Sequence, residues 1–367
     1  MARALNFSAG PAALPLEVLE RAQREFSSYQ ESGMSIMEMS HRGKHYNRVH
    51  SEAKNRLKRL LEVPDTHDIL FLQGGASLQF SMVPMNFLHE GQTAGYIVTG
   101  SWAEKALKEA QKIGQTKVIA SSKEKQFRSI PLRTEWTAHE GLAYLHITSN
   151  NTIYGTQWHE FPETDARLVA DMSSDILSRP LDIGKFGLIY AGAQKNLGPS
   201  GVTVVIANKE WLAAGSCPQS KFLDYNTHAE ADSLYNTPPT FAIYMLGLVL
   251  EWAEEQGGTR GLEKKNREKA AALYDSIEGS GGFYMPHAEK GSESQMNVTF
   301  TLADKDLETD FLAKAAEQGF IGLNGHRSIG GCRASIYNAV PLEACEKLAG
   351  FMNAYRKNHP ASTFSFQ

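Results

Sequence analysis

The stretch FGLIYAGAQKNLGPSGVTVVIA, residues 186–207, consists of two apolar runs joined by a short loop that carries one lysine, Lys195. Both runs are rich in Val, Ile and Leu and do not alternate with polar residues, which is typical of strands covered on both faces. The loop AQKNLGPS is too short for a crossover between parallel strands. We therefore expect these two strands to pair antiparallel.

Five further runs of the same kind precede this stretch, and helix-like segments such as residues 102–113 lie between several of them. The runs are DILFL (68–72), GYIVT (95–99), TKVIAS (116–121), LAYLHIT (142–148) and RLVADMS (167–173). Strands that alternate with helices favour an α/β fold. The seven runs together predict a mainly parallel, seven-stranded sheet.

A second region begins near Gly257. The segment GGTRGLEKKNREKAAALYDSI (257–277) is expected to open as a loop and to continue as a charged amphipathic helix. Beyond it, MNVTFTL (296–302) and CRASIYNAV (332–340) resemble strands on either side of a helix around residues 307–318. This pattern predicts a small α+β domain. The expected division is an N-terminal segment (1–15), a large α/β domain (16–257) and a small C-terminal domain (258–367).

The composition restricts the kinds of partner. The 367 residues are 42% hydrophobic and 21% charged, and the net charge of −4 gives no reason to expect a nucleic-acid partner. Three widely spaced cysteines fit a reducing compartment rather than a disulfide framework. The first residues resemble no signal peptide, and the longest apolar stretch, 241–250, is about half a membrane span. We expect a soluble, cytoplasmic protein without membrane contact.

Lys195 is the first candidate for a functional residue. Its loop is no nucleotide-binding motif: Gly187 and Gly192 have the spacing of a Walker A loop, but Ala193 stands where that motif needs lysine. A lysine in a turn is most often a solvated surface residue. The chemical alternative is a nucleophile, because desolvation lowers the pKa of a lysine and frees its amine to form a Schiff base.

A Schiff-base lysine that serves pyridoxal phosphate needs further groups, and each has a candidate. Asp171 could hold the proton of the ring nitrogen, although it could equally cap a strand end. The loop GGAS (74–77) lies between a strand and a helix, where backbone N–H groups bind phosphate. Trp102 could cover the ring, although lone tryptophans are more often core residues. All three follow predicted strands, where α/β sites form.

Two basic stretches could bind anionic substrates. SHRGKHYNRVH (40–50) holds Arg42, Lys44 and Arg48 with three histidines and no acid. Its histidines lack the glutamate of the HExxH zinc motif, so the sequence predicts no metal site, and the lysine and Arg48 could form a solvated helix face.

The stretch NGHRSIGGCRASIYNA (324–339) adds His326, Arg327 and Arg333. Arg333 lies in an apolar, strand-like run. An unpaired guanidinium would be costly there, so we expect Arg333 to have a carboxylate partner.

These stretches, in their order along the chain, resemble the phosphoserine aminotransferase family, a class V group of the fold-type I pyridoxal-phosphate enzymes. The resemblance covers essentially the whole chain. It rests on NFSAGPAALP (6–15), MSHRGK (39–44), LQGGASLQF (72–80), TGSW (99–102), NNTIYGTQ (150–157), DMSSD (171–175), YAGAQKNLGPSG (190–201), YNTPPTFAIY (235–244) and GHRSIGGCRASIYNA (325–339).

The resemblance implies that pyridoxal phosphate is bound covalently to Lys195, that Asp171 pairs with the pyridine nitrogen and that Trp102 stacks on the ring. The further cofactor contacts that it implies are Ala76, Ser77 and Gln194 at the phosphate and Thr152 near the ring hydroxyl. Ser77 and Leu78 stand where some relatives carry a basic residue, which leaves the charge at this point open.

The resemblance also implies a homodimer with shared active sites. Asn236 and Thr237 are similar to the pair that reaches the cofactor phosphate of the other subunit. Arg333 is expected to bind the substrate α-carboxylate, and the N-terminal segment to contribute to the site. The expected cluster for the distal phosphate or carboxylate is His41 and Arg42, donated by the partner, with His326 and Arg327.

The implied activity is reversible amino transfer from L-glutamate to 3-phosphohydroxypyruvate, which gives O-phospho-L-serine and 2-oxoglutarate in serine biosynthesis. Use of 4-phosphohydroxy-L-threonine in vitamin B6 biosynthesis stays open. The alternative is an aminotransferase of the alanine–glyoxylate type, which has no need of the basic cluster. A cysteine desulfurase needs a mobile reactive cysteine, whereas Cys332 lies in a strand-like run. The Lys195–Asp171 pair argues against a non-catalytic binding protein.

Overall fold

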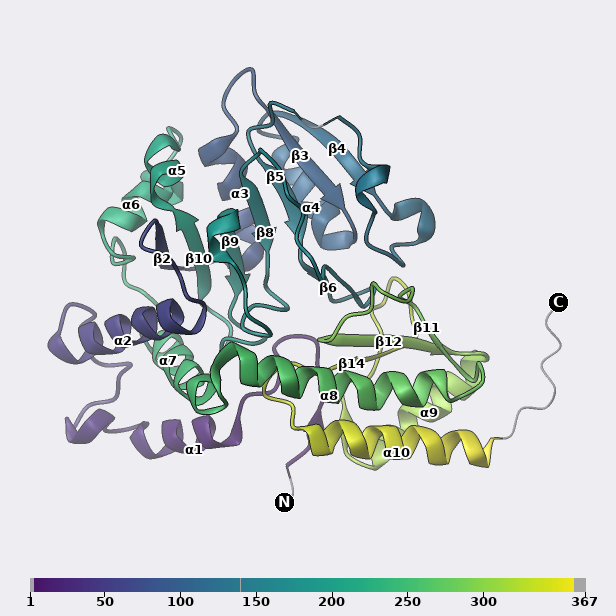
Figure 1. Cartoon of the computed structure of the whole chain (residues 1–367). Coiled ribbons are helices and arrows are strands. Elements are labelled where there is room, and N and C mark those ends of the chain that lie inside the picture. The colour runs from purple at the N-terminus through teal and green to yellow at the C-terminus, as the bar shows by residue number, and fades with distance from the viewer. Residues whose placement is uncertain (1–2, 139, 360–367) are drawn as a thin grey trace.

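The computed structural model describes residues 3–138 and 140–359. The ends of two expected parts, residues 1–2 of the N-terminal segment and residues 360–367 of the small domain, lie outside the described residues. Figure 1 shows a large sheet flanked by helices and, beside it, a smaller sheet with α8, α9 and α10.

All seven predicted strands are present, and they form one sheet in the order β2-β10-β9-β8-β5-β3-β4. β10 runs antiparallel to β9 and to β2, and the other neighbours are parallel. The mainly parallel α/β sheet and the antiparallel pair are therefore confirmed. The strands are β2 (His67–Leu72), β3 (Thr93–Val98), β4 (Gln115–Ser121), β5 (Leu145–Thr148), β8 (Leu168–Asp171), β9 (Phe186–Gly192) and β10 (Thr203–Asn208).

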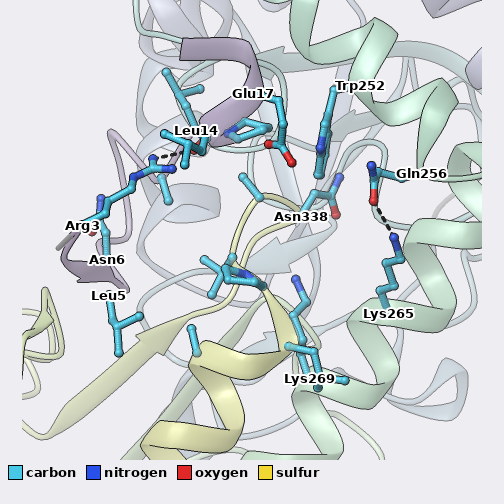
Figure 2. A pocket seen from close by; sticks show the side chains of 18 of the residues that line it. Arg3, Leu5, Asn6, Leu14, Glu17, Trp252, Gln256, Lys265, Lys269 and Asn338 are labelled. Atoms are coloured by element: carbon cyan, nitrogen blue, oxygen red, sulfur yellow. Dashed lines mark hydrogen bonds between the residues drawn. The ribbon is translucent and has the colours of Figure 1, made fainter. Parts of the chain in front are cut away.

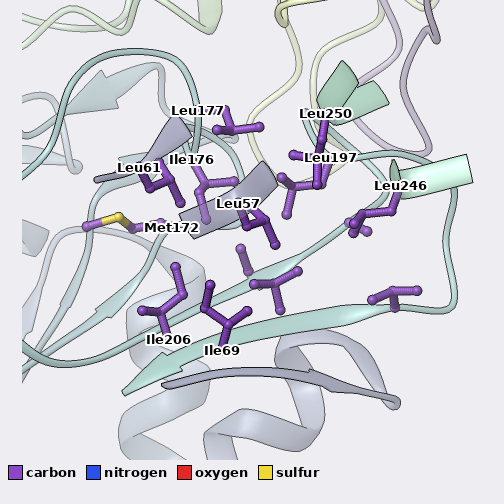
Figure 3. Packing of buried hydrophobic residues seen from close by; sticks show 14 of the residues in the cluster. Leu57, Leu61, Ile69, Met172, Ile176, Leu177, Leu197, Ile206, Leu246 and Leu250 are labelled. Atoms are coloured by element: carbon purple, nitrogen blue, oxygen red, sulfur yellow. The ribbon is translucent and has the colours of Figure 1, made fainter. Parts of the chain in front are cut away.

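Helices cover both faces of this sheet, which explains why its strands read as continuous apolar runs. Ile69 and Phe71 of β2 pack with α2 (Lys44–Leu60) and α7 (Thr240–Glu255). Leu70 and Leu72 point the other way and pack with α3 (Gly75–Phe87) and α4 (Ser101–Ala110). Figure 3 shows the first of these layers. Each fully buried leucine or isoleucine contributes about 1.5–3 kcal/mol.

The predicted buried helix at residues 241–250 is part of α7, whose middle turns are buried on all sides. Within residues 3–138 and 140–359, no helix is long and apolar enough to span a membrane. The remaining elements around the large sheet are α1 (Leu16–Glu25), α5 (Lys209–Ala214), α6 (Tyr225–Glu230) and the pair β6 (Asn150–Asn151) and β7 (Thr156–Gln157).

The smaller sheet has the antiparallel order β11-β12-β14 and a core of its own. Its elements are α8 (Gly258–Glu278), β11 (Tyr284–Pro286), β12 (Asn297–Leu302), α9 (Lys305–Glu317), β14 (Cys332–Ser335) and α10 (Leu342–Asn358). The N-terminal β1 (Leu5–Asn6) pairs in parallel with β13 (Phe320–Ile321). The beginning of the chain is thereby attached near its other end.

Two boundaries predicted in the second region were wrong. The glycines at 257 and 258 do not open a loop: Gly257 takes a left-handed φ of 91° at the start of α8, and its carbonyl accepts the N–H of Gly261 at 3.1 Å. The strand predicted at 332–340 ends at Ser335. Beyond it, the carbonyls of Ile336 and Tyr337 accept hydrogen bonds from Lys269 instead of a neighbouring strand.

Gly155, between β6 and β7, lies directly against the smaller sheet. Its φ is +70°, and a Cβ there would lie 2.9 Å from the carbonyl oxygen of Asn297 and would also overlap Thr299. The hydroxyl of Thr299 donates to the carbonyl of Tyr154 at 3.0 Å. The absence of a side chain at Gly155 is therefore required for this contact between the β6–β7 turn and the smaller sheet.

We expect Gly155→Ala to destabilise the protein through both strain and overlap. Gly141 provides a matched control, because its φ is +68° and no atom lies within 4 Å of the added methyl position. Gly141→Ala should lower the free energy of unfolding by about 1–2 kcal/mol. Gly155→Ala should lower it by about 1–3 kcal/mol more. Denaturant unfolding measures both, and equal losses would contradict the proposed close contact.

Candidate active site

Lys195 lies in the turn of the β9–β10 hairpin. Gly192 pairs with Thr203 at the end of the ladder. Inside the turn, the carbonyl of Ala193 accepts the N–H groups of Lys195 and Gly198 at 2.7 and 2.8 Å. The lysine is thus held at the carboxyl end of β9, where its Nζ donates to the hydroxyl of Thr152 at 3.2 Å.

Asp171 is the last residue of β8, the strand next to β9. Its carboxylate is buried and accepts the N–H of Ser173 at 2.9 Å. Burial raises the pKa of Asp171, while the hydrogen bond from Ser173 and the charge of Lys195 act in the opposite direction. In the described part of the chain, no basic side chain lies within ion-pair distance of this carboxylate.

Arg333 reaches the same place from β14 of the smaller sheet. Its Nη1 donates to the carbonyl of Thr152 at 3.3 Å, and its Nε is buried without a hydrogen-bond partner. Burial lowers the pKa of Arg333. The expected carboxylate partner is not supplied by any of residues 3–138 or 140–359. The guanidinium therefore keeps a donor for a bound anion.

Two helices begin at the same edge of the sheet. Gly74 and Gly75, with φ of 86° and 65°, turn the chain from β2 into α3. The N–H groups in the first turn of a helix have no partner within the helix, which favours a bound anion there. Ala76 and Ser77 lie in this turn. Trp102 lies in the first turn of α4, directly after β3.

These side chains line one cavity of about 320 Å³. It lies at the carboxyl ends of β5, β8 and β9, as expected for an α/β sheet. The predicted site residues in its wall are Ala76, Ser77, Trp102, Thr152, Asp171, Gln194, Lys195, His326 and Arg333.

Five predicted site residues do not line this cavity. Arg42 and Arg327 are exposed, and so is Thr237, whose carbonyl accepts hydrogen bonds from Gln73 and Asn236. The remaining two, His41 and Asn236, are partly exposed. Apart from Arg327, all of them were expected to act in the partner subunit's site. Arg327 was expected to act in its own chain. Burial is the largest cause that lowers the pKa of His326, followed by the charges of Arg333, Lys105 and Arg327.

Sequence reasoning named the N-terminal segment but not its wall residues, Ala9 and Gly10. A Cβ on Gly10 would lie 3.6 Å from Cε of Lys195, so bare backbone packs against the lysine. The N–H of Ala12 donates to the carbonyl of Gln194 at 2.8 Å and holds the segment in place. The φ of Gly10 is +149°, which explains glycine in the stretch NFSAGP.

No single motif of the sequence indicated the buried polar network beneath the cavity. Asp175 accepts hydrogen bonds from the hydroxyl of Ser149 and from Gln157, and burial raises its pKa. Asn150 lines the cavity and donates to Asn297 of β12 at 2.7 Å. Two aspartates in the short motif DMSSD, in an apolar surrounding, were the available signal.

The family model described as "Aminotransferase class-V" matches residues 4–348. The chain belongs to this family. The phosphoserine aminotransferase of Geobacillus kaustophilus is 66% identical to this class-V aminotransferase over 357 residues, which are 97% of this chain and 99% of that protein.

Two solved structures extend the similarity to the fold. The phosphoserine aminotransferase from Bacillus circulans subsp. alkalophilus has a TM-score of 0.96 at 56% identity and covers 97% of this chain and 99% of its own. That of Trichomonas vaginalis, solved with pyridoxal phosphate bound, has a TM-score of 0.90 at 39% identity and covers 95% and 99%. The class-V aminotransferase therefore has the expected fold type I.

The residues in the cavity of this class-V aminotransferase fit pyridoxal phosphate. A protonated ring nitrogen would give the buried carboxylate of Asp171 a cationic donor, which no side chain of residues 3–138 or 140–359 provides. The first turn of α3 has free N–H groups for the phosphate. Lys195 lines the same cavity as Asp171 and the first turn of α3, and Trp102 adds an aromatic side chain to its wall.

We expect Asp171→Asn to stabilise the cofactor-free protein. Because burial raises the pKa of Asp171, the carboxyl is equally protonated in both states below its unfolded pKa, and its ionisation disfavours the folded state at higher pH. The unfolding midpoint at pH 7 should rise by about 2 °C, and this gain should vanish near pH 3.

Asp165→Asn is the matched control for this prediction. Asp165 is exposed, so its substitution should leave the midpoint unchanged at both pH values. Thermal unfolding followed by circular dichroism measures these shifts. A midpoint of Asp171→Asn at or below that of the unchanged chain at pH 7 would show that the carboxylate is not held at a cost.

Proposed function

We propose that this class-V aminotransferase is a phosphoserine aminotransferase. It transfers the amino group of L-glutamate to 3-phosphohydroxypyruvate and so forms O-phospho-L-serine and 2-oxoglutarate in serine biosynthesis. The observation that carries this proposal is that one cavity is lined by Lys195, by the buried Asp171 and by Arg333, which has a free donor for an anion. Identity of 66% to a phosphoserine aminotransferase over nearly the whole chain supports it.

Bound pyridoxal phosphate, attached to Lys195 at rest, supplies a ring that stabilises negative charge at the substrate Cα. Asp171 holds a proton on the ring nitrogen and so keeps that ring electron-withdrawing. The amine of Lys195, once the substrate had displaced it from the cofactor, would take the proton from Cα and would deliver it to the cofactor carbon that had carried the aldehyde group. Thr152 accepts a hydrogen bond from this amine and orients it.

Arg333 binds the α-carboxylate of both substrates. A guanidinium pairs with a carboxylate through two parallel hydrogen bonds, and the bond of Nη1 to the carbonyl of Thr152 sets its orientation. His326 lies in the wall of the same cavity. Partial burial and the charge of Arg333 lower the pKa of His326, whereas a dianionic phosphate bound beside it raises this pKa and favours the protonated form.

The homodimer with shared sites belongs to this proposal. His41, Arg42, Asn236 and Thr237 lie outside the cavity of their own chain, which agrees with a role in the partner's site. The proposed organisation is an N-terminal segment to residue 15, a cofactor-binding domain to residue 257 and a small domain from residue 258. The proposed location is the cytoplasm.

The acceptor specificity tests the proposed function. With L-glutamate as donor, kcat/KM for 3-phosphohydroxypyruvate should exceed that for pyruvate, glyoxylate and oxaloacetate by about 10²-fold or more, since only the phosphorylated acid offers a dianion to His326 and the basic cluster. Lys195→Ala should lower kcat by about 10²–10⁴-fold. Lys185→Ala, an exposed lysine, should leave it unchanged. Preference for an unphosphorylated acceptor would instead favour the alanine–glyoxylate type.

Complementation tests the shared site. Lys195→Ala disables a chain's own site, whereas Arg42→Ala disables the site of its partner. Each variant alone should be nearly inactive. Co-expressed in equal amounts, they should recover about a quarter of full activity, because half of the dimers are mixed and each mixed dimer has one intact site. A mixture no more active than its components would place Arg42 in its own chain's chemistry or outside the site.

A further inference from the structure

A second cavity, of about 550 Å³, lies outside the active site (Figure 2). It is bounded by the N-terminal segment, the end of α7, α8 and the beginning of α10. Much of its wall is apolar. The larger apolar side chains in the wall are Leu5, Leu14, Pro15, Leu16, Trp252, Val340, Pro341 and Leu342. Nothing in the proposed aminotransferase chemistry uses this space.

One side of the cavity holds a buried cation. Lys269 on α8 is only 1% exposed, and its Nζ donates to the carbonyls of Ile336 and Tyr337, each at 2.8 Å. Burial, the main cause, lowers the pKa of Lys269 to about 7. Within residues 3–138 and 140–359, no carboxylate lies within ion-pair distance of this ammonium.

The charges of the cavity are unevenly placed. Lys265, one turn before Lys269 on α8, also lines the wall, and its Nζ approaches the amide oxygen of Gln256. The acids of the wall, Glu17 and Glu268, are exposed. In Figure 2 the carboxylate of Glu17 lies across the cavity from Lys269, beside Trp252. Arg3 on the N-terminal segment also lines the wall and donates to the carbonyl of Leu14 at 2.6 Å. Among the charged side chains of this wall, Lys269 is buried and the others are exposed, so water screens the charge of Lys269 least.

We propose that this cavity is a second ligand site, and that it binds a small carboxylic acid with an apolar, ring-sized body. The carboxylate faces Lys269 and supplies the counter-charge that the protein does not. The body packs on Trp252 and Leu14. A monoanion suits the site, because two of the three N–H groups of Lys269 are already used. A cationic ligand would meet an uncompensated ammonium.

The second cavity shares structural elements with the active site. The segment that contributes Ala9 and Gly10 to the active-site cavity continues into Ala13 and Leu14 of the second cavity. Asn338 lines the second cavity, and its N–H donates at 2.9 Å to the side chain of Asn196, the neighbour of Lys195. The second cavity therefore has fixed walls and is pre-formed.

Binding of 3-phenylpropanoate to the cofactor-loaded protein tests the proposal. Calorimetry and tryptophan fluorescence should detect saturable binding. The alcohol 3-phenylpropanol, the neutral compound with the same ring, should bind at least about tenfold more weakly. Affinity for the acid should fall about tenfold or more from pH 6.5 to 8.5, since the ammonium loses its proton in this range and binding then requires proton uptake.

Variants locate the binding. Lys269→Met, which keeps the length of the side chain and removes the charge, should weaken binding of the acid about tenfold or more and should abolish the pH dependence. Lys264→Met, an exposed lysine of the same helix, should bind the acid normally. Arg333→Met should also bind normally, which separates this cavity from the active site.

Several outcomes would overturn the proposal: no saturable binding at millimolar probe, equal affinity for acid and alcohol, affinity independent of pH, or loss of binding in Arg333→Met but not in Lys269→Met. The comparison of the two probes and the pH series use the unchanged chain. They decide the question even where Lys269→Met fails to fold.

Discussion

The reversal of the chain between β9 and β10 is the constraint on which the rest of the site depends. In a parallel sheet the chain leaves each strand for a distant helix, whereas here it turns back within a few residues. The turn therefore stays at the carboxyl edge of the sheet. It presents Lys195 to the cavity. The carbonyl of Gln194 accepts a hydrogen bond from the N-terminal segment, and the side chain of Asn196 accepts one from the backbone of Asn338, beyond β14 of the smaller sheet.

The buried charges of the cavity lower the stability of the cofactor-free chain. Asp171 is a buried carboxylate with a raised pKa, and the buried Nε of Arg333 has no hydrogen-bond partner among the described residues. Well-packed apolar residues at these positions would suit the isolated fold better. Their arrangement is explained by bound partners of opposite charge, since each group then gains what burial has removed.

The fold was predictable because burial on both faces leaves a local mark, a run of Val, Ile and Leu, in each strand. The lysine, the aspartate and the glycine turn were predictable because each follows such a run directly. The polar network was not, because Asn150 and Asn297 meet only in the folded chain and neither stands in a distinctive local pattern. The division of labour between subunits for Arg42 and Asn236 came from family resemblance and not from the pattern of residues.

The pairing of β1 with β13 has a consequence for how the protein is made. Leu5 pairs with Phe320, so this pairing cannot form until the chain has been made as far as Phe320. Contacts between such distant parts of a chain form late, since the loop between them must be closed first. The segment from Ala9 to Leu14 is a wall of both cavities. A growing chain can thus complete its large sheet early and still have no closed site until β13 has been made.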